Sequence, residues 1–201
     1  MIDVPGCLVL IVGPPGAGKD TLLERARRVL AEDTRIRFAR RVVDNRREKR
    51  LDTHEPLDEA SFTSQLAVGA FALSWRAEGH RYGVRNDIML DLAAGQVVVA
   101  NVSRAVVAAA AEKFPVRLIE LRVSADMLAL RLVARGRADA VVAARRLARP
   151  LPLPAWLPLE VIVNEGGVEQ GAAAVVAALL SAAESLPVVS QPRGVSQPPK
   201  R

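Results

Sequence analysis

A glycine-rich stretch near the amino terminus has the residue types and the spacing of a phosphate-binding loop. Residues 13–21 read Gly-Pro-Pro-Gly-Ala-Gly-Lys-Asp-Thr and match the pattern G-x-x-x-x-G-K. In this pattern the glycines let backbone N–H groups surround an anionic phosphate, and the lysine reaches the terminal phosphates of a nucleotide. We therefore expect nucleotide contacts from every residue of the loop, namely Gly13, Pro14, Pro15, Gly16, Ala17, Gly18, Lys19, Asp20 and Thr21.

The end of the loop departs from the usual pattern. Where Ser or Thr normally follows the lysine and binds magnesium through its hydroxyl, this chain has Asp20, with Thr21 one place later. A carboxylate is a good Mg²⁺ ligand, directly or through water, so the sequence predicts metal binding at these two residues. The alternative is a Gly/Pro turn that binds nothing. It is disfavoured because an apolar run at residues 7–12 precedes the loop and a helical pattern follows it.

Alternating apolar runs and helical patterns predict the elements that position this loop. Strands that are apolar throughout are typical of parallel sheets covered on both faces. The predicted fold class is therefore α/β: a P-loop NTPase with three α/β/α layers and a mostly parallel central sheet. The expected strands are residues 7–12, 35–43, 97–101, 116–123 and 159–164, with helices between them and a last helix at residues 168–183.

Residues 44–84 interrupt this alternation and are predicted to form a small α+β insert that holds an acceptor substrate. Residues 44–52 are almost wholly charged, and composition favours a solvated connection over a phosphate site. A helix at 58–69 and a β-hairpin made by residues 71–75 and 80–84 are expected to follow.

Polar residues follow the strand at residues 97–101. Because ligands of parallel sheets bind beyond the carboxyl ends of the strands, we expect Asn101, Ser103 and Arg104 beside the phosphate loop. Asn101 can organise water around a metal ion but brings no charge. Ser103 is equally well explained as the cap of a helix that begins at Arg104.

Arginines gather between residues 131 and 149. An isolated pair of arginines is usually a solvated helix end. Phosphoryl-transfer enzymes, however, use arginines on a mobile cover to neutralise the charge of the transferred group. Together with the phosphate loop, this favours an Arg-rich lid at residues 135–150.

Length and composition limit the class of protein. The chain fits one kinase-sized domain at residues 1–185, followed by a flexible Pro-rich tail at residues 186–201. The net charge of +6 comes mainly from arginine, but aromatic residues make up only 3% of the chain, so no nucleic-acid partner is expected. No apolar run reaches the ~20 residues of a membrane span, and the start of the chain lacks a signal-peptide pattern. We therefore expect a cytoplasmic protein.

Several stretches together resemble one family, the ribose 1,5-bisphosphate phosphokinases of phosphonate catabolism, which are relatives of guanylate kinase. The resemblance covers roughly residues 7–170 in collinear order. It is carried by the loop with its Lys-Asp pair, Phe-Ala-Leu-Ser-Trp at 71–75 with Tyr-Gly-Val at 82–84, Asn-x-Ser-Arg at 101–104, and Leu-Arg-Leu at 130–132 with Arg-Gly-Arg at 135–137.

This resemblance implies that ATP, with Mg²⁺, donates its γ-phosphoryl group to the 1-phosphate of ribose 1,5-bisphosphate, which gives 5-phosphoribosyl 1-diphosphate. A phosphate acceptor is already anionic and needs no base, in agreement with a sequence that shows no base constellation. The catalytic residues implied are Lys19, Arg131, Arg135 and Arg137. The substrate-binding residues implied are Arg46, His54, Tyr82, Asn101, Ser103, Arg104 and Arg146.

The insert departs from the family pattern. The usual Thr-Arg-Pro is Asp-Asn-Arg at residues 44–46, so Arg46 or Arg47 would have to replace an arginine that binds acceptor phosphate. Two other functions stay open: a nucleoside monophosphate kinase of guanylate kinase type, and a nucleotide-binding module with weakened catalysis. The expected partner is a small-molecule sugar phosphate, with no membrane association, and a homodimer stays open.

Overall fold

The computed structural model describes residues 2, 4–45, 54–77, 79–134 and 152–186. Its centre is a five-stranded sheet in the order β2-β7-β1-β8-β9, and all neighbouring strands run parallel. The predicted α/β class with a parallel central sheet is confirmed. The strands are β1 (Cys7–Val12), β2 (Ile36–Phe38), β7 (Val97–Asn101), β8 (Val116–Arg122) and β9 (Leu159–Val163).

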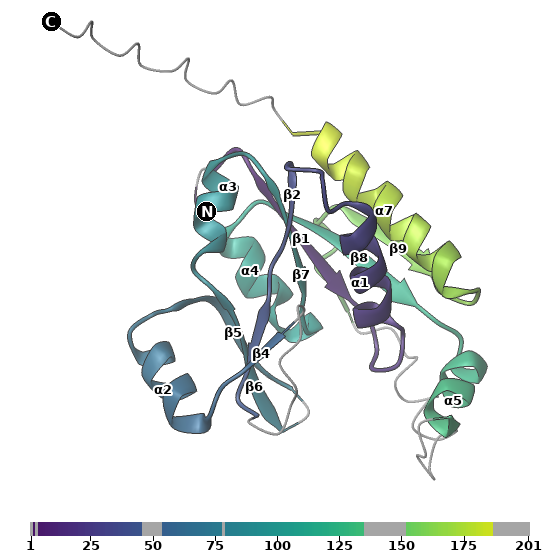
Figure 1. The fold of residues 1–201 in the computed structure, drawn as a ribbon, viewed down its shortest axis with the longest axis horizontal. Helices are drawn as coiled ribbons and strands as arrows, with labels where there is room; N and C mark the ends of the chain where they lie inside the picture. Colours follow the sequence, from purple (N-terminus) through teal and green to yellow (C-terminus); the bar gives the residue numbers. More distant parts are fainter. Residues whose placement is uncertain (1, 3, 46–53, 78, 135–151, 187–201) are drawn as a thin grey trace, which may run out of the picture.

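Helices cover both faces of this sheet (Figure 1). The helices α1 (Lys19–Val29) and α7 (Val168–Glu184) pack on one face, together with α5 (Ala125–Val133). The opposite face is covered by α3 (Ile88–Ala93) and α4 (Val107–Lys113), and the latter follows a short 3₁₀ turn, η1 (Arg104–Val106). The three predicted layers are therefore present.

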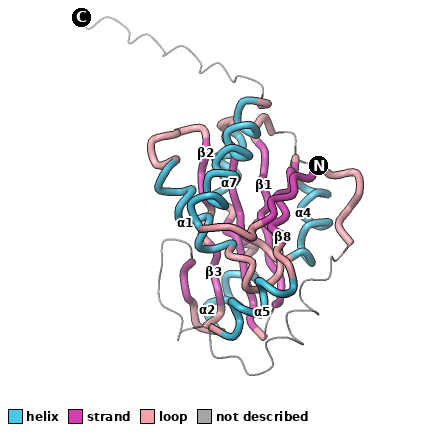
Figure 2. The backbone as a smooth tube through the Cα atoms, turned by 90° about the vertical axis from the view of Figure 1, so that its right-hand side faces the viewer, coloured by secondary structure: helices cyan, strands magenta, loops and turns pink. Residues whose placement is uncertain are grey.

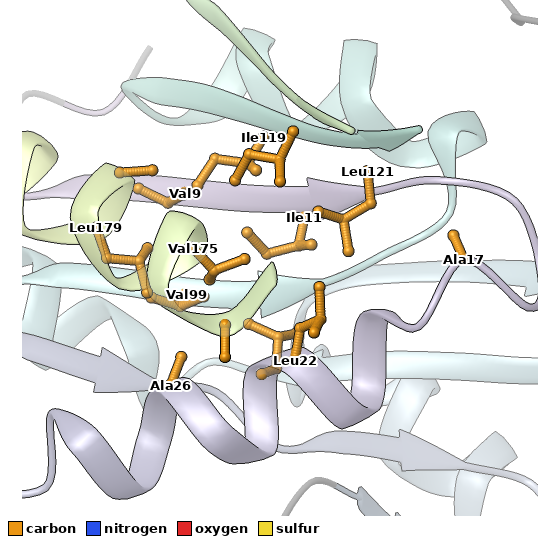
Figure 3. Packing of buried hydrophobic residues seen from close by; sticks show 14 of the residues in the cluster. Val9, Ile11, Ala17, Leu22, Ala26, Val99, Ile119, Leu121, Val175 and Leu179 are labelled. Carbon is orange, nitrogen blue, oxygen red and sulfur yellow. The ribbon is translucent and has the colours of Figure 1, made fainter. Parts of the chain in front are cut away.

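The central strand β1 is buried along its whole length, as is its neighbour β7. All six of its residues are buried, which explains why its sequence is an apolar run without alternation. Its side chains divide between two cores. Val9 and Ile11 face the core under α1 and α7, where Leu22 and Val175 meet them (Figure 3), whereas Leu10 faces the core under α3 and α4. The loop after β1 is thus attached to a strand that is covered on both faces.

A second, four-stranded sheet lies beside the first, in the order β4-β3-β6-β5. The hairpin of β5 (Phe71–Ala77) and β6 (His80–Arg85) is confirmed, and so is the helix before it, α2 (Glu59–Ala67), which Asp58 caps. In Figure 2, β3 and α2 lie together at the end of the molecule below α1 and β2. The remaining strands are β3 (Arg41–Val43) and β4 (His54–Pro56).

The single strand expected at residues 35–43 is wrong. It is two strands in two different sheets: β2 pairs parallel with β7, and β3 pairs antiparallel with β6 and parallel with β4. Alternation of polar and apolar residues reports one buried face and does not specify the sheet that a strand joins. The small sheet therefore begins at Arg41, ahead of residue 44, where the insert was expected to start.

Three predicted segments fall largely or wholly outside the described residues. These are most of the charged loop at 44–52, the lid at 135–150 and the tail at 186–201. Within the described part of the chain, no helix is long and apolar enough to cross a membrane.

Candidate phosphoryl-transfer site

The loop between β1 and α1 has a backbone that only glycine adopts easily. Gly16 and Gly18 have φ angles of 90° and 92°, in the left-handed region that side chains disfavour. The space is closed as well, because a Cβ atom on Gly13 would lie 2.6 Å from the carbonyl oxygen of Leu121. The loop thus lies directly against β8, and its shape is fixed by backbone contacts.

Helix α1 begins at Lys19, inside the loop. The free N–H groups and the positive end of its dipole therefore point to the loop, an arrangement that favours a bound phosphate. The Lys19 ammonium lies across the loop, where it donates hydrogen bonds to the carbonyl oxygens of Gly13 and Pro14 at 2.8 and 3.0 Å. Thr21 is exposed in the first turn of the same helix.

Two side chains from distant elements hold the far side of the loop. The buried Asn164, just after β9, donates from Nδ2 to the carbonyl oxygen of Ala17 at 2.7 Å. Arg131 of α5 donates to the carbonyl oxygens of Ala17 and Asn164 at 3.4 and 2.9 Å. The structure thus brings Arg131 to the phosphate loop, and it contacts the backbone there.

Asp20 joins the loop to two other strands. Its Oδ1 accepts hydrogen bonds from Asn101 Nδ2 at 2.6 Å and from the Arg41 guanidinium at 2.9 Å. Asn101 ends β7, next to β1, and Arg41 begins β3 in the small sheet. The expected neighbourhood of Asp20 and Asn101 is therefore present. Arg41 joins them from a part of the chain to which the sequence assigned no site role.

The same arginine contacts the small sheet. The Arg41 guanidinium lies 5.8 Å from the centre of the Tyr82 ring, a cation–π distance. The Tyr82 ring in turn stacks on Trp75 across the hairpin, with centroids 5.6 Å apart. His54 is the strand partner of Arg41 in β4 and is buried. Tyr82 and His54, two predicted acceptor residues, therefore both lie next to Arg41.

Arg104 begins η1, after the end of β7, and forms an ion pair with the buried Glu120 of β8. Its guanidinium donates to Glu120 Oε1 at 2.8 Å, and Arg122 pairs with the second oxygen of the same carboxylate at 2.7 Å. Glu120 is only 1% exposed, and burial of a carboxylate is costly unless it is paired and hydrogen-bonded in this way. Ser103 caps η1 by accepting a hydrogen bond from the Ala105 N–H, as the structural interpretation of that serine expected.

Asp44 opens the charged loop and is bound to the small sheet. Its carboxylate accepts hydrogen bonds from the Arg81 backbone N–H at 2.7 Å and from the Arg81 guanidinium at 2.6 Å. Burial alone would raise the pKa of this carboxyl, but the Arg81 hydrogen bonds and charge, with His80 nearby, outweigh it and lower the pKa. Asp44, the first residue of this loop, is therefore bound to the small sheet, whereas composition favoured a solvated connection for the loop.

Comparisons with known proteins place the chain in a family. The model of the AAA domain matches residues 8–150. The ribose 1,5-bisphosphate phosphokinase PhnN of Methylobacterium radiotolerans is 46% identical over 177 residues, 88% of this chain and 98% of that protein. The enzyme of the same name from Acidiphilium cryptum is 43% identical over 178 residues, 87% of this chain and 93% of its own length. The chain belongs to the ribose 1,5-bisphosphate phosphokinase family.

A solved structure agrees on the architecture. The guanylate kinase of Anaplasma phagocytophilum superposes with a TM-score of 0.59 at 17% identity, over 90% of this chain and 88% of that one. A likeness at this identity shows the shared fold. The family prediction from the loop, the hairpin and the Asn-x-Ser-Arg motif is confirmed, and the protein is a phosphotransferase with a nucleotide-binding fold.

The residues around Asp20 fit a nucleotide with Mg²⁺. Mg²⁺ at phosphoryl-transfer sites is usually bound by one or two carboxylates together with substrate phosphate oxygens, and Asp20 offers one carboxylate. Asn101 Oδ1 is buried and has no hydrogen-bond partner, so it could accept a bond from metal-bound water. Among the described residues, no group of three or more His, Cys, Asp or Glu could hold a metal ion by itself.

Sequence reasoning missed three residues of this site. Asn164 directly follows the last strand. Ligands of parallel sheets bind beyond the carboxyl ends of the strands, and this rule, which selected Asn101, could also have selected Asn164. Glu120 is the one acid in β8, a mostly buried strand, and a carboxylate at such a position needs a partner of opposite charge. Arg41 had no such signal. Four predicted site residues lie outside the described residues: Arg46, Arg135, Arg137 and Arg146.

Proposed function

We propose that this protein transfers the γ-phosphoryl group of ATP to the 1-phosphate of ribose 1,5-bisphosphate, which gives 5-phosphoribosyl 1-diphosphate and ADP. The 46% identity to a protein named for this substrate, over nearly its whole length, supports the proposal. The observation that carries it is the meeting of Asp20, Asn101 and Arg41 at the phosphate loop. Cationic and amide groups suit an acceptor that is already a phosphate anion.

The reaction needs no proton transfer. An anionic oxygen of the acceptor 1-phosphate attacks the γ-phosphorus, the bond from that phosphorus to the β-γ bridging oxygen breaks, and ADP leaves with the electron pair. The protein contributes position and positive charge. Lys19 leaves the carbonyl oxygens of Gly13 and Pro14 to reach the terminal phosphates, and Arg131, Arg135 and Arg137 neutralise the group in transfer.

Asp20 and Thr21 would hold Mg²⁺, which screens the charge of the phosphates. The acceptor would lie between the small sheet and the end of β7. It would be bound by Arg46, His54, Tyr82, Asn101, Ser103, Arg104 and Arg146. The product suits a role in phosphonate breakdown and in the supply of phosphoribosyl diphosphate.

One assay with three acceptor conditions tests this function. Purified protein is incubated with ATP and Mg²⁺ and with ribose 1,5-bisphosphate, with GMP or with no acceptor, and each phosphorylated product is identified by mass. We expect 5-phosphoribosyl 1-diphosphate in the first reaction alone. Phosphorylation of GMP and not of the sugar would contradict the proposal in favour of a nucleoside monophosphate kinase. ATP binding without either product would indicate a nucleotide-binding module.

A further inference from the structure

Arg41 lies where the nucleotide side of the candidate site meets the acceptor side. It begins β3 of the small sheet, and its guanidinium donates to Oδ1 of Asp20 in the phosphate loop at 2.9 Å. The same guanidinium lies 5.8 Å from the centre of the Tyr82 ring in β6. Asp20, Arg41 and Asn101 also line one hollow beside α1. A single cation thus contacts a residue predicted to bind metal and a residue predicted to bind the acceptor.

The ion pair between Arg41 and Asp20 is open to solvent on the side of the acid. The Asp20 side chain is 61% exposed, whereas the Arg41 side chain is 18% exposed. An exposed ion pair contributes little stability, because water screens the attraction and both side chains lose freedom. A phosphate carries more negative charge than a carboxylate and matches the fork of N–H donors on a guanidinium. A bound phosphate can therefore take Arg41 from Asp20 at small cost.

Two other arginine pairs near the acceptor are held more firmly. Arg81 binds the largely buried Asp44 through both its backbone N–H and its guanidinium, and Arg104 binds the buried Glu120. Removing an arginine from a buried carboxylate leaves an uncompensated charge, which is costly. These two pairs fix the orientation of their arginines, whereas the pair of Arg41 allows an exchange of partner.

Asn101 keeps Asp20 in position without help from Arg41. The Asn101 side chain is buried at the end of β7, and its Nδ2 donates to Asp20 Oδ1 at 2.6 Å. In the described part of the chain, both hydrogen bonds to Asp20 fall on Oδ1. The Oδ2 atom is thus left for Mg²⁺ or for a metal-bound water. Asp20 can therefore serve the nucleotide side after Arg41 has left it.

We propose that Arg41 is shared between the two substrates: it neutralises Asp20 before they bind, and it binds the reacting phosphate of the sugar once Asp20 serves the magnesium–nucleotide complex. This inference rests on the function proposed above. The contact with Tyr82 keeps the guanidinium at the acceptor side during the exchange. Because Asp20 and the acceptor compete for one guanidinium, a nucleotide that engages Asp20 strengthens acceptor binding. By linkage, the acceptor strengthens nucleotide binding by the same factor.

Arg41 also supplies a cation for acceptor phosphate that does not depend on Arg46 or Arg47. The sequence lacks the usual Thr-Arg-Pro at residues 44–46, so one of those two arginines was expected to replace it. Arg41 comes from β3, ahead of the charged loop, and already lies against the phosphate loop.

The first test measures acceptor binding by calorimetry, with and without nucleotide. The probes are ribose 1,5-bisphosphate and the non-hydrolysable adenosine 5′-(β,γ-imido)triphosphate with Mg²⁺, so that no transfer takes place. For the wild type, the dissociation constant of the sugar bisphosphate should fall about fivefold or more when the analogue is present. In Arg41→Gln it should be about tenfold above the wild-type value with the analogue, and the effect of the analogue should disappear. Arg41→Lys keeps the charge and should recover part of the affinity.

Asp20→Asn is the sharper test, because the two roles of Asp20 predict opposite changes. The amide no longer holds the charge of Arg41, so without nucleotide this variant should bind ribose 1,5-bisphosphate about threefold or more tighter than the wild type. Phosphoryl transfer should fall at the same time, because a metal ligand is lost. The controls are Glu24→Gln, one turn along α1, and Arg76→Gln, exposed on β5. Both should keep the dissociation constant of the sugar within about twofold.

The outcomes distinguish this inference from the proposed function. If the wild-type protein neither binds nor phosphorylates ribose 1,5-bisphosphate, the proposed function fails, and the sharing of Arg41 fails with it. If the wild type phosphorylates the sugar, but Arg41→Gln binds it normally or Asp20→Asn does not bind it more tightly, the exchange is refuted while the function stands. Equal losses of affinity for the analogue alone and for the sugar in Arg41→Gln would assign Arg41 to the stability of the site.

Discussion

The two sides of the candidate site are held together in different ways. The phosphate loop is fixed mainly by its backbone: Gly13 lies against the carbonyl oxygen of Leu121, and Asn164 binds the carbonyl oxygen of Ala17. The acceptor side is held by charged side chains instead, such as Arg41 on Asp20 and Arg81 on Asp44.

This difference suits the two ligands. ATP presents the same phosphates in every P-loop protein, so a rigid backbone cradle serves it. An acceptor must be selected by its own shape and charge, and side chains on a small sheet can change without disturbing the central core. Substitutions on the loop side should therefore abolish phosphoryl transfer. Substitutions on the acceptor side should instead change the KM of the acceptor.

The largest effect is expected for Lys19→Ala. The ammonium that reaches the terminal phosphates is lost, so kcat should fall by about 10³-fold or more. Because the side chain is not part of either apolar core, the melting temperature should stay near that of the wild type. Lys113→Ala, at the end of α4, is the control and should keep full activity. Retained transfer in Lys19→Ala would remove the loop from the mechanism.

Gly13→Ala tests whether the loop is held by its backbone. The added Cβ would lie 2.6 Å from the Leu121 carbonyl oxygen, so the loop or β8 must shift. We expect a loss of roughly 1–3 kcal/mol of unfolding free energy and at least tenfold weaker ATP binding, measured by denaturation and calorimetry. Gly167→Ala is the matched control, since a Cβ there meets no atom within 4 Å. Equal behaviour of the two variants would contradict the steric account.

Glu120→Gln tests the acceptor side at its most buried charge. Without the carboxylate, Arg104 loses the partner that orients its guanidinium, and Arg122 loses the same partner. We expect the KM of the acceptor to rise about tenfold with little change in the KM of ATP, because a charged hydrogen bond is lost. Glu160→Gln, on the exposed part of β9, should leave both constants unchanged. Equal increases of both KM values would assign Glu120 to stability alone.

The smallest effect is expected for Asp44→Asn, and it depends on pH. The folded protein lowers the pKa of Asp44, so this carboxylate stabilises the fold at any pH above its ordinary value of about 4. That contribution is lost as the pH falls through the lowered pKa. At pH 7 the variant should lose about 1–2 kcal/mol of unfolding free energy, and the difference should shrink below pH 4. A difference that does not depend on pH would exclude the charge as its source. Asp126→Asn, at an exposed position in α5, is the control.

Local patterns were sufficient for most of the fold. Local patterns gave β1, β7, β8 and β9 of the central sheet, and Asp58 followed by an early acid gave α2. The failure at residues 35–43 came where one alternating stretch is divided between two sheets. Pairing partners are set by long-range packing, and the period of a strand holds no information about them.

The site shows the same division. The order of strand and loop placed Asp20 and Asn101 together correctly, because the carboxyl ends of parallel strands meet at one edge. Arg41 could not be found in this way, since it reaches Asp20 from the small sheet. The chain also contains many arginines, and nothing in the residues around Arg41 distinguishes it from the others.

The sequence by itself determined that the protein has a phosphate loop on a parallel sheet, and to which family it belongs. These features depend on short motifs whose residues are neighbours along the chain, so they can be recognised from residue types and spacing alone. Only the tertiary structure decided which charges meet: Arg41 with Asp20, and Arg104 with Glu120. An arginine side chain is long and can pair with acidic groups on several different elements. Its partner is therefore determined by which elements the packing of the fold brings within its reach.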